Sequence, residues 1–146
     1  MIIDLKKIKR SGKDSEDFHF EYHPEKELID IPNAKLVLPI QITGRVSLTG
    51  EHSCYIDGEV DFSIQGECTR CLKDTTNRYV IEFFESADSQ AEDCYPVKND
   101  TVDLTKIIED VVLINVPINF LCDKDCKGIC LNCGTNLNDG ECKCKN

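Results

Sequence analysis

The architecture follows from residues 40–65, which read IQITGRVSLTGEHSCYIDGEVDFSIQ. Apolar and polar side chains alternate along two runs in this stretch, residues 40–48 and 54–64. Alternation with a period of two puts the apolar side chains of a strand on one face, so both runs are predicted to be half-buried strands. Residues 49–53 are typical of a hairpin loop. The stretch therefore predicts a hairpin.

Two finer expectations follow from this hairpin. Gly58 interrupts the second run and marks a candidate β-bulge. If the hairpin centres on Glu51, Arg45 lies opposite Asp57, and the two side chains form one cross-strand charge pair. The row of acidic side chains beside Asp57 is explained by the wet face of a sheet, without catalytic carboxylates.

Further strands are predicted on both sides of the hairpin. A third strand spans about residues 78–84, and the polar residues 86–100 after it are typical of a loop. Near the N-terminus, residues 2–8 and 18–22 are short candidate strands that extend the sheet.

One amphipathic helix is predicted after the loop. Apolar residues from Leu104 to Ile114 recur at helical spacing, with Thr101 or Asp103 as the N-cap and Pro117 as the stop. The apolar face of this helix is predicted to cover the apolar face of the sheet. The fold class is therefore α+β, an antiparallel β-meander covered by one amphipathic helix.

The composition describes one small acidic domain. The chain has 146 residues, 27 acidic and 17 basic side chains and a formal net charge of −10. Residues 14–121 carry 22 acidic and 8 basic side chains, and such a segment repels a phosphate backbone. It suits a basic protein partner better. No apolar run is long enough for a secretory signal or a membrane span, so we expect a cytoplasmic protein with reduced thiols.

Ten cysteines are the second unusual feature of the chain, and six of them lie in residues 122–146. That segment has too few aliphatic side chains to form a core, so another interaction must order it. We interpret it as a cysteine-rich, zinc-binding tail, packed on or tethered to an α+β body of residues 1–121. The predicted ligands are Cys68, Cys71, Cys122, Cys126, Cys130, Cys133, Cys142 and Cys144.

Spacing suggests how these ligands group. A C-x2-C pair lets one tight turn point two thiolates at the same metal ion. The pair at Cys130 can be completed by the two cysteines near the C-terminus, and the pair at Cys68 by Cys122 and Cys126. A grouping with Cys126 in the tail site agrees equally well with the spacing. Cys54 falls on an apolar strand face and is predicted to be a core residue, whereas Cys94 is predicted to be a loop thiol.

Other functions were weighed against these residues. A redox-active Cys68 and Cys71 pair calls for a thiolate at a helix N-terminus, whereas here one strand leads in and another leads out. Neither a deaminase pattern nor a phosphate-binding glycine loop is present, and no acid–base constellation surrounds the histidines. We predict no catalytic residues and no enzyme activity. The main alternative is a zinc-ribbon module that binds nucleic acid through the basic N-terminal run and four tail lysines, Lys124, Lys127, Lys143 and Lys145.

Three segments resemble the YceD family of large ribosomal RNA subunit accumulation proteins. They are GECTRCL at residues 66–72, VPI at residues 116–118 and CKGICLNCGTNLN at residues 126–138. Cys68 and Cys71 match a pair shared through the family, whereas the tail cysteines match only a subset of its members. Leu131 stands where similar tails have proline.

The resemblance implies a cytoplasmic, non-enzymatic factor for the accumulation or processing of large-subunit ribosomal RNA. Together with the acidic middle segment, it suggests a basic ribosomal protein or a ribosomal precursor particle as the partner, with direct RNA contact disfavoured by charge.

Overall fold

The computed structural model describes residues 1–144. Within this range the strands form a 7-stranded sheet in the order β1-β7-β6-β5-β4-β3-β2, in which only β5 and β6 run parallel. The elements are, in chain order, β1 (Ile2–Asp4), α1 (Leu5–Arg10), β2 (Ser15–Tyr22), β3 (Ala34–Leu48), β4 (Ser53–Glu67), β5 (Asp74–Asp88), β6 (Tyr95–Lys98), β7 (Thr101–Asp103) and α2 (Leu104–Asn115).

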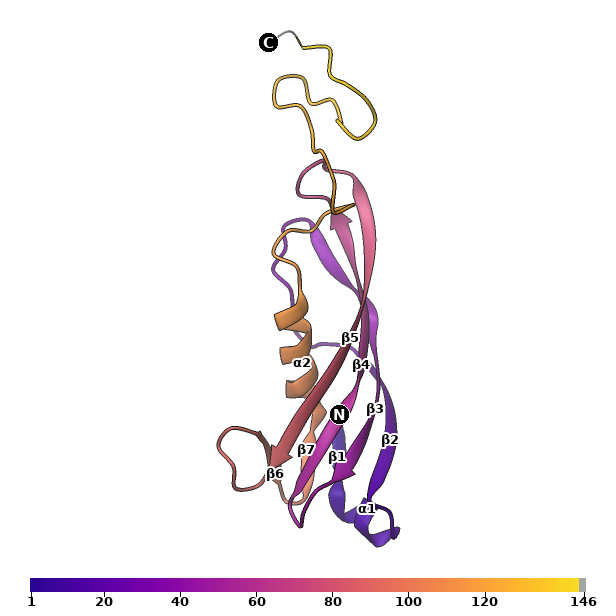
Figure 1. Cartoon of the computed structure of the whole chain (residues 1–146), viewed down its shortest axis with the longest axis vertical. Helices are drawn as coiled ribbons and strands as arrows, with labels where there is room; N and C mark the ends of the chain where they lie inside the picture. Colours follow the sequence, from indigo (N-terminus) through magenta and orange to yellow (C-terminus); the bar gives the residue numbers. More distant parts are fainter. Residues whose placement is uncertain (145–146) are drawn as a thin grey trace.

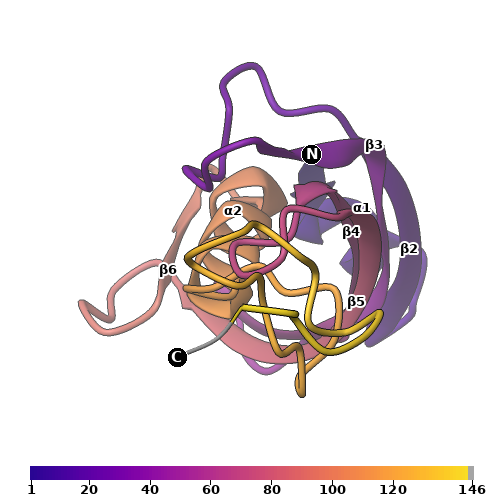
Figure 2. The same ribbon diagram turned by 90° about the horizontal axis from the view of Figure 1, so that it is seen from above.

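The molecule is elongated because β3, β4 and β5 are each 15 residues long (Figure 1). The sheet curls, and α2 lies inside the curl (Figure 2). The segment after α2 runs towards the turn between β4 and β5 and continues beyond it as the yellow tail of Figure 1. The molecule therefore has two ends. We call the end beyond the turn between β4 and β5 the cysteine-rich end, and the opposite end lies near α1.

The predicted hairpin is confirmed, with Arg45 opposite Asp57 in the register of β3 and β4. The charge pair that we expected from this register is wrong, because Arg45 instead donates to Asp17 on β2, with Nε 2.6 Å from Oδ1. The predicted bulge at Gly58 is also wrong. Gly58 lies directly opposite Gly44 without a break in register, and the irregularity falls between Val37 and Gln41.

Steric crowding explains why glycine stands at both of these facing positions. A Cβ atom on Gly58 would overlap the carbonyl oxygen of Thr43 and the Cα atom of Gly44, and a Cβ atom on Gly44 would overlap the carbonyl oxygen of Asp57. Glycine at both positions therefore permits a close approach of the two backbones.

The helix α2 is confirmed and covers the sheet as predicted. It begins after Asp103, whose Oδ1 accepts a hydrogen bond of 2.9 Å from the backbone N–H of Thr105. Its buried side chains belong to one hydrophobic core with the inward-facing residues of β3, β4 and β5. These helical core residues are Leu104, Ile107, Ile108, Val111 and Val112.

The sheet is larger than the predicted meander. The third strand reaches from Asp74 to Asp88, and residues 86–100, predicted to be a loop, contain the end of β5 and all of β6. Strands of 4 and 3 residues, such as β6 and β7, are too short to show a periodic pattern. The strand expected at residues 18–22 is confirmed within β2, which pairs with β3.

The strand predicted at residues 2–8 is wrong beyond Asp4. Asp4 caps α1 by accepting a hydrogen bond of 3.1 Å from the N–H of Lys7. Leu5 and Ile8, one turn apart on this helix, are both fully buried. A single helical turn thus buries two aliphatic side chains that a strand would place on opposite faces.

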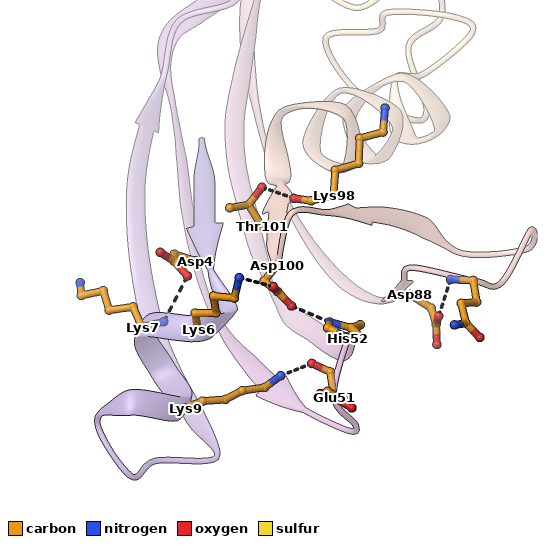
Figure 3. A network of polar contacts seen from close by, with 11 residues as sticks. Asp4, Lys6, Lys7, Lys9, Glu51, His52, Asp88, Lys98, Asp100 and Thr101 are labelled. Atoms are coloured by element: carbon orange, nitrogen blue, oxygen red, sulfur yellow. Dashed lines mark hydrogen bonds and ion pairs between the residues drawn. The ribbon is translucent and has the colours of Figure 1, made fainter.

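The end of the molecule near α1 is held by polar contacts (Figure 3). Asp100 lies in the turn between β6 and β7, and Lys6 and His52 point towards its carboxylate. Lys6 Nζ is 2.8 Å from Oδ2, and His52 Nδ1 is 2.5 Å from Oδ1. Lys9 also contacts the backbone carbonyl of Glu51. Among the described helices, none is long and apolar enough to cross a membrane.

Candidate metal centres

Eight cysteines gather into two groups of four at one end of the molecule. In each group the four sulfur atoms all lie within 4.8 Å of one another, so each group could hold a metal ion. We call Cys68, Cys71, Cys122 and Cys126 the hairpin group, and Cys130, Cys133, Cys142 and Cys144 the tail group. Of the two groupings that spacing allows, the structure has the one in which Cys126 joins Cys68.

The hairpin group lies at the end of the sheet. Cys68 and Cys71 belong to the turn between β4 and β5, and Cys122 and Cys126 follow α2. The Sγ atoms of Cys68 and Cys126 are 3.7 Å apart, and those of Cys71 and Cys122 are 3.5 Å apart. Four sulfurs about 2.3 Å from a tetrahedrally coordinated zinc ion are about 3.8 Å from each other. The spacing therefore fits a four-thiolate metal site.

The two C-x2-C loops share one hydrogen-bond pattern. The N–H of Cys68 donates to the carbonyl of Lys73 at 2.9 Å, and the N–H of Leu72 donates back to the carbonyl of Cys68 at 2.9 Å. In the tail, Cys130 donates to Thr135 and Gly134 donates back to Cys130, both at 2.8 Å. These bonds close a tight turn that leaves both thiols of each pair on the same side.

The residue after the second cysteine has a positive φ in both loops. It is Leu72 with φ 60° in the first loop and Gly134 with φ 72° in the second. Glycine adopts this conformation freely, whereas leucine adopts it at a cost. The side chain of Leu72 is 59% exposed, so its position is set by the loop rather than by burial.

Backbone contacts fix the chain after α2 against the first loop. The N–H of Thr69 donates to the carbonyl of Phe120 at 2.8 Å, and Asn77 Nδ2 donates to the carbonyl of Leu121 at 2.8 Å. Arg70 Nη1 donates to the carbonyl of Cys126 at 3.1 Å. Phe120 itself is fully buried in the main core. These contacts bring Cys122 and Cys126 to the sheet end.

The hairpin group has a small apolar shell of its own. Cys68, Cys71 and Cys126 are buried, and Leu121, Cys122 and Ile129 pack against them. The division of the chain at residue 121 stays a prediction, but this group takes two cysteines from either side of that boundary.

The tail group packs against much less of the protein than the hairpin group does. Its cysteines are exposed or half-buried, and Leu131 between the first two is 97% exposed. Besides the two hydrogen bonds that close its own loop, its backbone contacts include a bridge between Ile129 and Asn136 and a hydrogen bond of 2.9 Å from Leu137 N–H to the Gly128 carbonyl. Without a hydrophobic core, such a segment needs another source of order.

Asn138 contacts the hairpin group and was not singled out from the sequence. Its Nδ2 lies 3.3 Å from the Sγ of Cys126, and its Oδ1 accepts a hydrogen bond of 2.8 Å from the N–H of Lys127. Thr135 Oγ1 similarly lies 3.1 Å from the Sγ of Cys133. Polar residues two to twelve positions from a cysteine carry no pattern that distinguishes them from ordinary turn residues.

The thiols of each group differ in acidity. Burial opposes ionisation of Cys68, but the backbone amides of Cys122, Cys71 and Arg70 outweigh it and lower its pKa to about 6. Hydrogen bonds from the side chain and backbone of Thr135 lower the pKa of Cys133 to about 6. The neighbouring thiols act in the opposite sense, because contact with Cys71 and burial raise the pKa of Cys122 to about 12.

This pattern is expected where four thiols crowd together. Backbone and side-chain donors favour some thiolates, and each thiolate then disfavours the ionisation of its neighbours. In the tail group, contact with Cys133 and burial raise the pKa of Cys144 to about 12. A bound cation removes the repulsion between the thiolates, and only then can all four sulfurs act as ligands.

Two cysteines lie outside both groups. Cys54 is 1% exposed in the main core, as predicted, and burial raises its pKa to about 11. Cys94 is half-buried in the loop between β5 and β6, with its Sγ 3.1 Å from Ser86 Oγ.

Comparison with known sequences agrees with these features. The family model described as large ribosomal RNA subunit accumulation protein YceD matches residues 56–146, which include all eight grouped cysteines. The chain belongs to the YceD family. The matched region contains β5, α2 and the tail, but only part of the β3–β4 hairpin.

Curated relatives of this YceD-family chain come from bacteria and plants. A protein of Mycobacterium tuberculosis is 29% identical over 150 residues, covering 94% of this chain and 70% of its own length. Protein YlbN of Bacillus subtilis is 24% identical over 120 residues, covering 73% and 67%. The chloroplastic YCED homolog 1 of Arabidopsis thaliana, named as a large ribosomal RNA subunit accumulation protein, is 42% identical over 50 residues, or 34% of this chain.

These matches differ in extent. The matched stretch spans only 16% of the length of the Arabidopsis protein and 18% of that of the corresponding maize protein. No solved structure matches the chain.

Proposed function

We propose that this protein is a non-enzymatic ribosome biogenesis factor that supports the accumulation of large-subunit ribosomal RNA through contact with a basic ribosomal protein. The family description supports the role in RNA accumulation. The observation that favours a protein partner is the charge on the outer face of the sheet, the face turned away from α2.

Acidic side chains without ion-pair partners gather on this face. Asp57 and Glu59 on β4 and Glu82 on β5 point outwards, because the alternate residues of these strands fill the core. None of these three forms an ion pair within residues 1–144. The two nearby arginines form ion pairs with other carboxylates, Arg45 with Asp17 and Arg78 with Asp61.

Apolar side chains accompany these acids. Tyr55 and Phe84 contact each other across β4 and β5, with ring centroids 5.1 Å apart, and are 45% and 64% exposed. Val80 on β5 is 48% exposed. A surface with unpaired carboxylates and accessible aromatic rings suits lysine and arginine side chains, whose aliphatic stems pack on the rings. It repels a phosphate backbone.

As far as the described residues show, the cysteine-rich end has no basic surface that matches this acidic face in size. Lys124, Lys127 and Lys143 are exposed there, but Asp123, Asp125, Asp139 and Glu141 lie among them and are exposed too. Lys145 lies outside the described residues. Local charge therefore disfavours the tail as the nucleic-acid-binding surface of a zinc-ribbon module.

The function is tested by depleting the protein in its own cells. We expect mature large-subunit RNA to fall relative to small-subunit RNA, with recovery when the wild-type chain is supplied. Affinity purification should then yield a basic ribosomal protein after ribonuclease treatment. Unchanged RNA ratios would contradict the biogenesis role, and recovery of ribosomal RNA stripped of all proteins would favour the nucleic-acid alternative.

We also propose that both cysteine groups hold Zn²⁺. Four thiolates at tetrahedral spacing are typical ligands of structural zinc, and no ligand position is left open for a substrate. Mass spectrometry under native conditions should find two zinc ions per chain. Cys94→Ser, outside both groups, is the matched control and should keep both ions.

A further inference from the structure

The edge of β5 that faces away from β4 takes no part in the metal centres or the core. β6 pairs with β5 only at Ala87 and Asp88, and β4 pairs along the opposite edge. Residues 78–86 therefore have β4 on one side and no hydrogen-bonded strand on the other within the described chain. Figure 1 shows β6 beside only one end of β5.

A long open edge presents backbone N–H and C=O groups that can pair with another strand. Proteins commonly protect such edges with lysine and other charged side chains, with proline or with a bulge. Residues 78–86 have no lysine and no proline, their charged side chains are Arg78, Glu82 and Glu85, and their register with β4 continues without a bulge. It is therefore suited to β-strand addition, in which an extended peptide extends the sheet.

The side chains along the edge indicate which peptide fits. Val80, Glu82 and Phe84 alternate on the outer face, next to the unpaired acids of β4. Glu82 lies directly opposite Glu59, so two like charges face each other at this position. A cationic side chain on an added strand would relieve that repulsion, and its neighbours would pack on Val80 and Phe84.

We propose that β5 is the docking edge for an extended lysine- or arginine-rich segment of the partner protein, which adds as a strand beside residues 78–86. This inference rests on the proposed function in one respect, that the partner is a basic protein. The backbone provides affinity, and the acidic outer row selects for positive charge.

The test uses the full zinc-loaded chain and a synthetic ten-residue peptide of alternating lysine and valine. On binding, about half of the amide protons of residues 78–86 should become protected from hydrogen exchange, since every second residue of an edge strand points its N–H outwards. A control peptide has the same sequence with alternate backbone nitrogens methylated. It keeps the charge but loses hydrogen bonds, so equal binding would show charge attraction alone and overturn the docking mode.

A charge reversal on the edge tests the acidic row. Glu82→Lys should weaken binding of the peptide about tenfold. Its fold should be kept, because the new lysine faces Glu59. Glu27→Lys has the same charge change at an exposed position outside β5 and is the matched control, with unchanged affinity expected. Equal losses in both variants would show a general charge effect and overturn the assignment to β5.

Complementation separates this inference from the proposed function. Suppose that the Glu82→Lys variant no longer binds the peptide but still restores normal RNA levels in depleted cells. The edge is then not the functional surface, so the inference fails while the proposed function stands. If depletion of the whole protein leaves RNA levels unchanged, the proposed function fails instead. Displacement of the peptide from β5 by a short single-stranded RNA would also overturn the inference.

Discussion

The turn between β6 and β7 is held by Lys6 and His52, which both contact Asp100, whereas at the other end the turn after β4 and the chain after α2 meet through four sulfur atoms. The first end satisfies its buried carboxylate with the ammonium group of Lys6 and the imidazole ring of His52. The second end gathers thiols that repel one another once they ionise. One end is therefore held by contacts between the protein's own side chains, whereas the other gathers four sulfur atoms that could hold a metal ion.

Metal removal is expected to have the largest effect, and to disorder only the cysteine-rich end. A structural zinc ion contributes about 10–16 kcal/mol of apparent binding energy in small peptides, which exceeds what the few apolar side chains of the tail can supply. With a zinc chelator, amides of residues 128–144 should lose their protection from hydrogen exchange. Amides of β3, β4 and β5 should stay protected, but less strongly, because the hairpin group also loses its ion. Added zinc should restore the tail. A tail that stays protected without metal would contradict this account.

Single ligand variants should distinguish the two groups. Cys68→Ser and Cys130→Ser should each lose one zinc ion per chain. Cys68→Ser should also lower the free energy of unfolding by about 4 kcal/mol where free zinc exceeds the dissociation constant a thousandfold, because the hairpin group joins two parts of the fold. Cys130→Ser should leave urea unfolding of the sheet unchanged, as followed by circular dichroism. Equal destabilisation by both variants would show that the groups act as one unit.

The two similar loops offer an exchange of residues at the positive φ position. Leu72→Gly should stabilise the first loop by about 0.5–1 kcal/mol, because leucine at this φ is strained and mostly exposed. The reverse change, Gly134→Leu, should weaken zinc binding by the tail group by a cost of about 1–2 kcal/mol. Competition with a zinc chelator measures both. If Leu72→Gly weakened zinc binding or Gly134→Leu strengthened it, the two loops would share a hydrogen-bond pattern but not the same backbone strain.

The smallest effect is expected at the opposite end, from Asp100→Asn. Hydrogen bonds from Lys6 and His52 hold the pKa of Asp100 below its usual value. A lowered pKa stabilises the fold above the unfolded pKa near 4, and this contribution is lost as the pH falls through the folded pKa. Asp100→Asn should therefore be slightly less stable at pH 7 and equal to wild type near pH 2. Urea unfolding at both pH values measures the difference. Asp93→Asn, in an exposed loop, should show none.

Much of the body could be predicted from its sequence. The long alternating runs and the capped helix carry strong periodic patterns, so β3, β4 and α2 appear where the residues place them. What prediction missed was short or depended on context. β6 and β7 have too few residues for a pattern, and α1 is defined by a cap and two buried aliphatic side chains rather than by repetition. Arg45 lies opposite Asp57 as expected, but the neighbouring strand β2 offers Asp17 as its ion-pair partner instead.

The sequence by itself determined the chemistry of the protein: which residues alternate, which thiols come in C-x2-C pairs and where the acidic excess lies. Only the tertiary structure decided that Cys126 joins Cys68 rather than Cys130. Cys126 is four residues from both Cys122 and Cys130, so spacing favours neither side. Phe120 is buried in the core and its carbonyl accepts a hydrogen bond from Thr69, and this long-range contact carries the chain to the hairpin and fixes the choice.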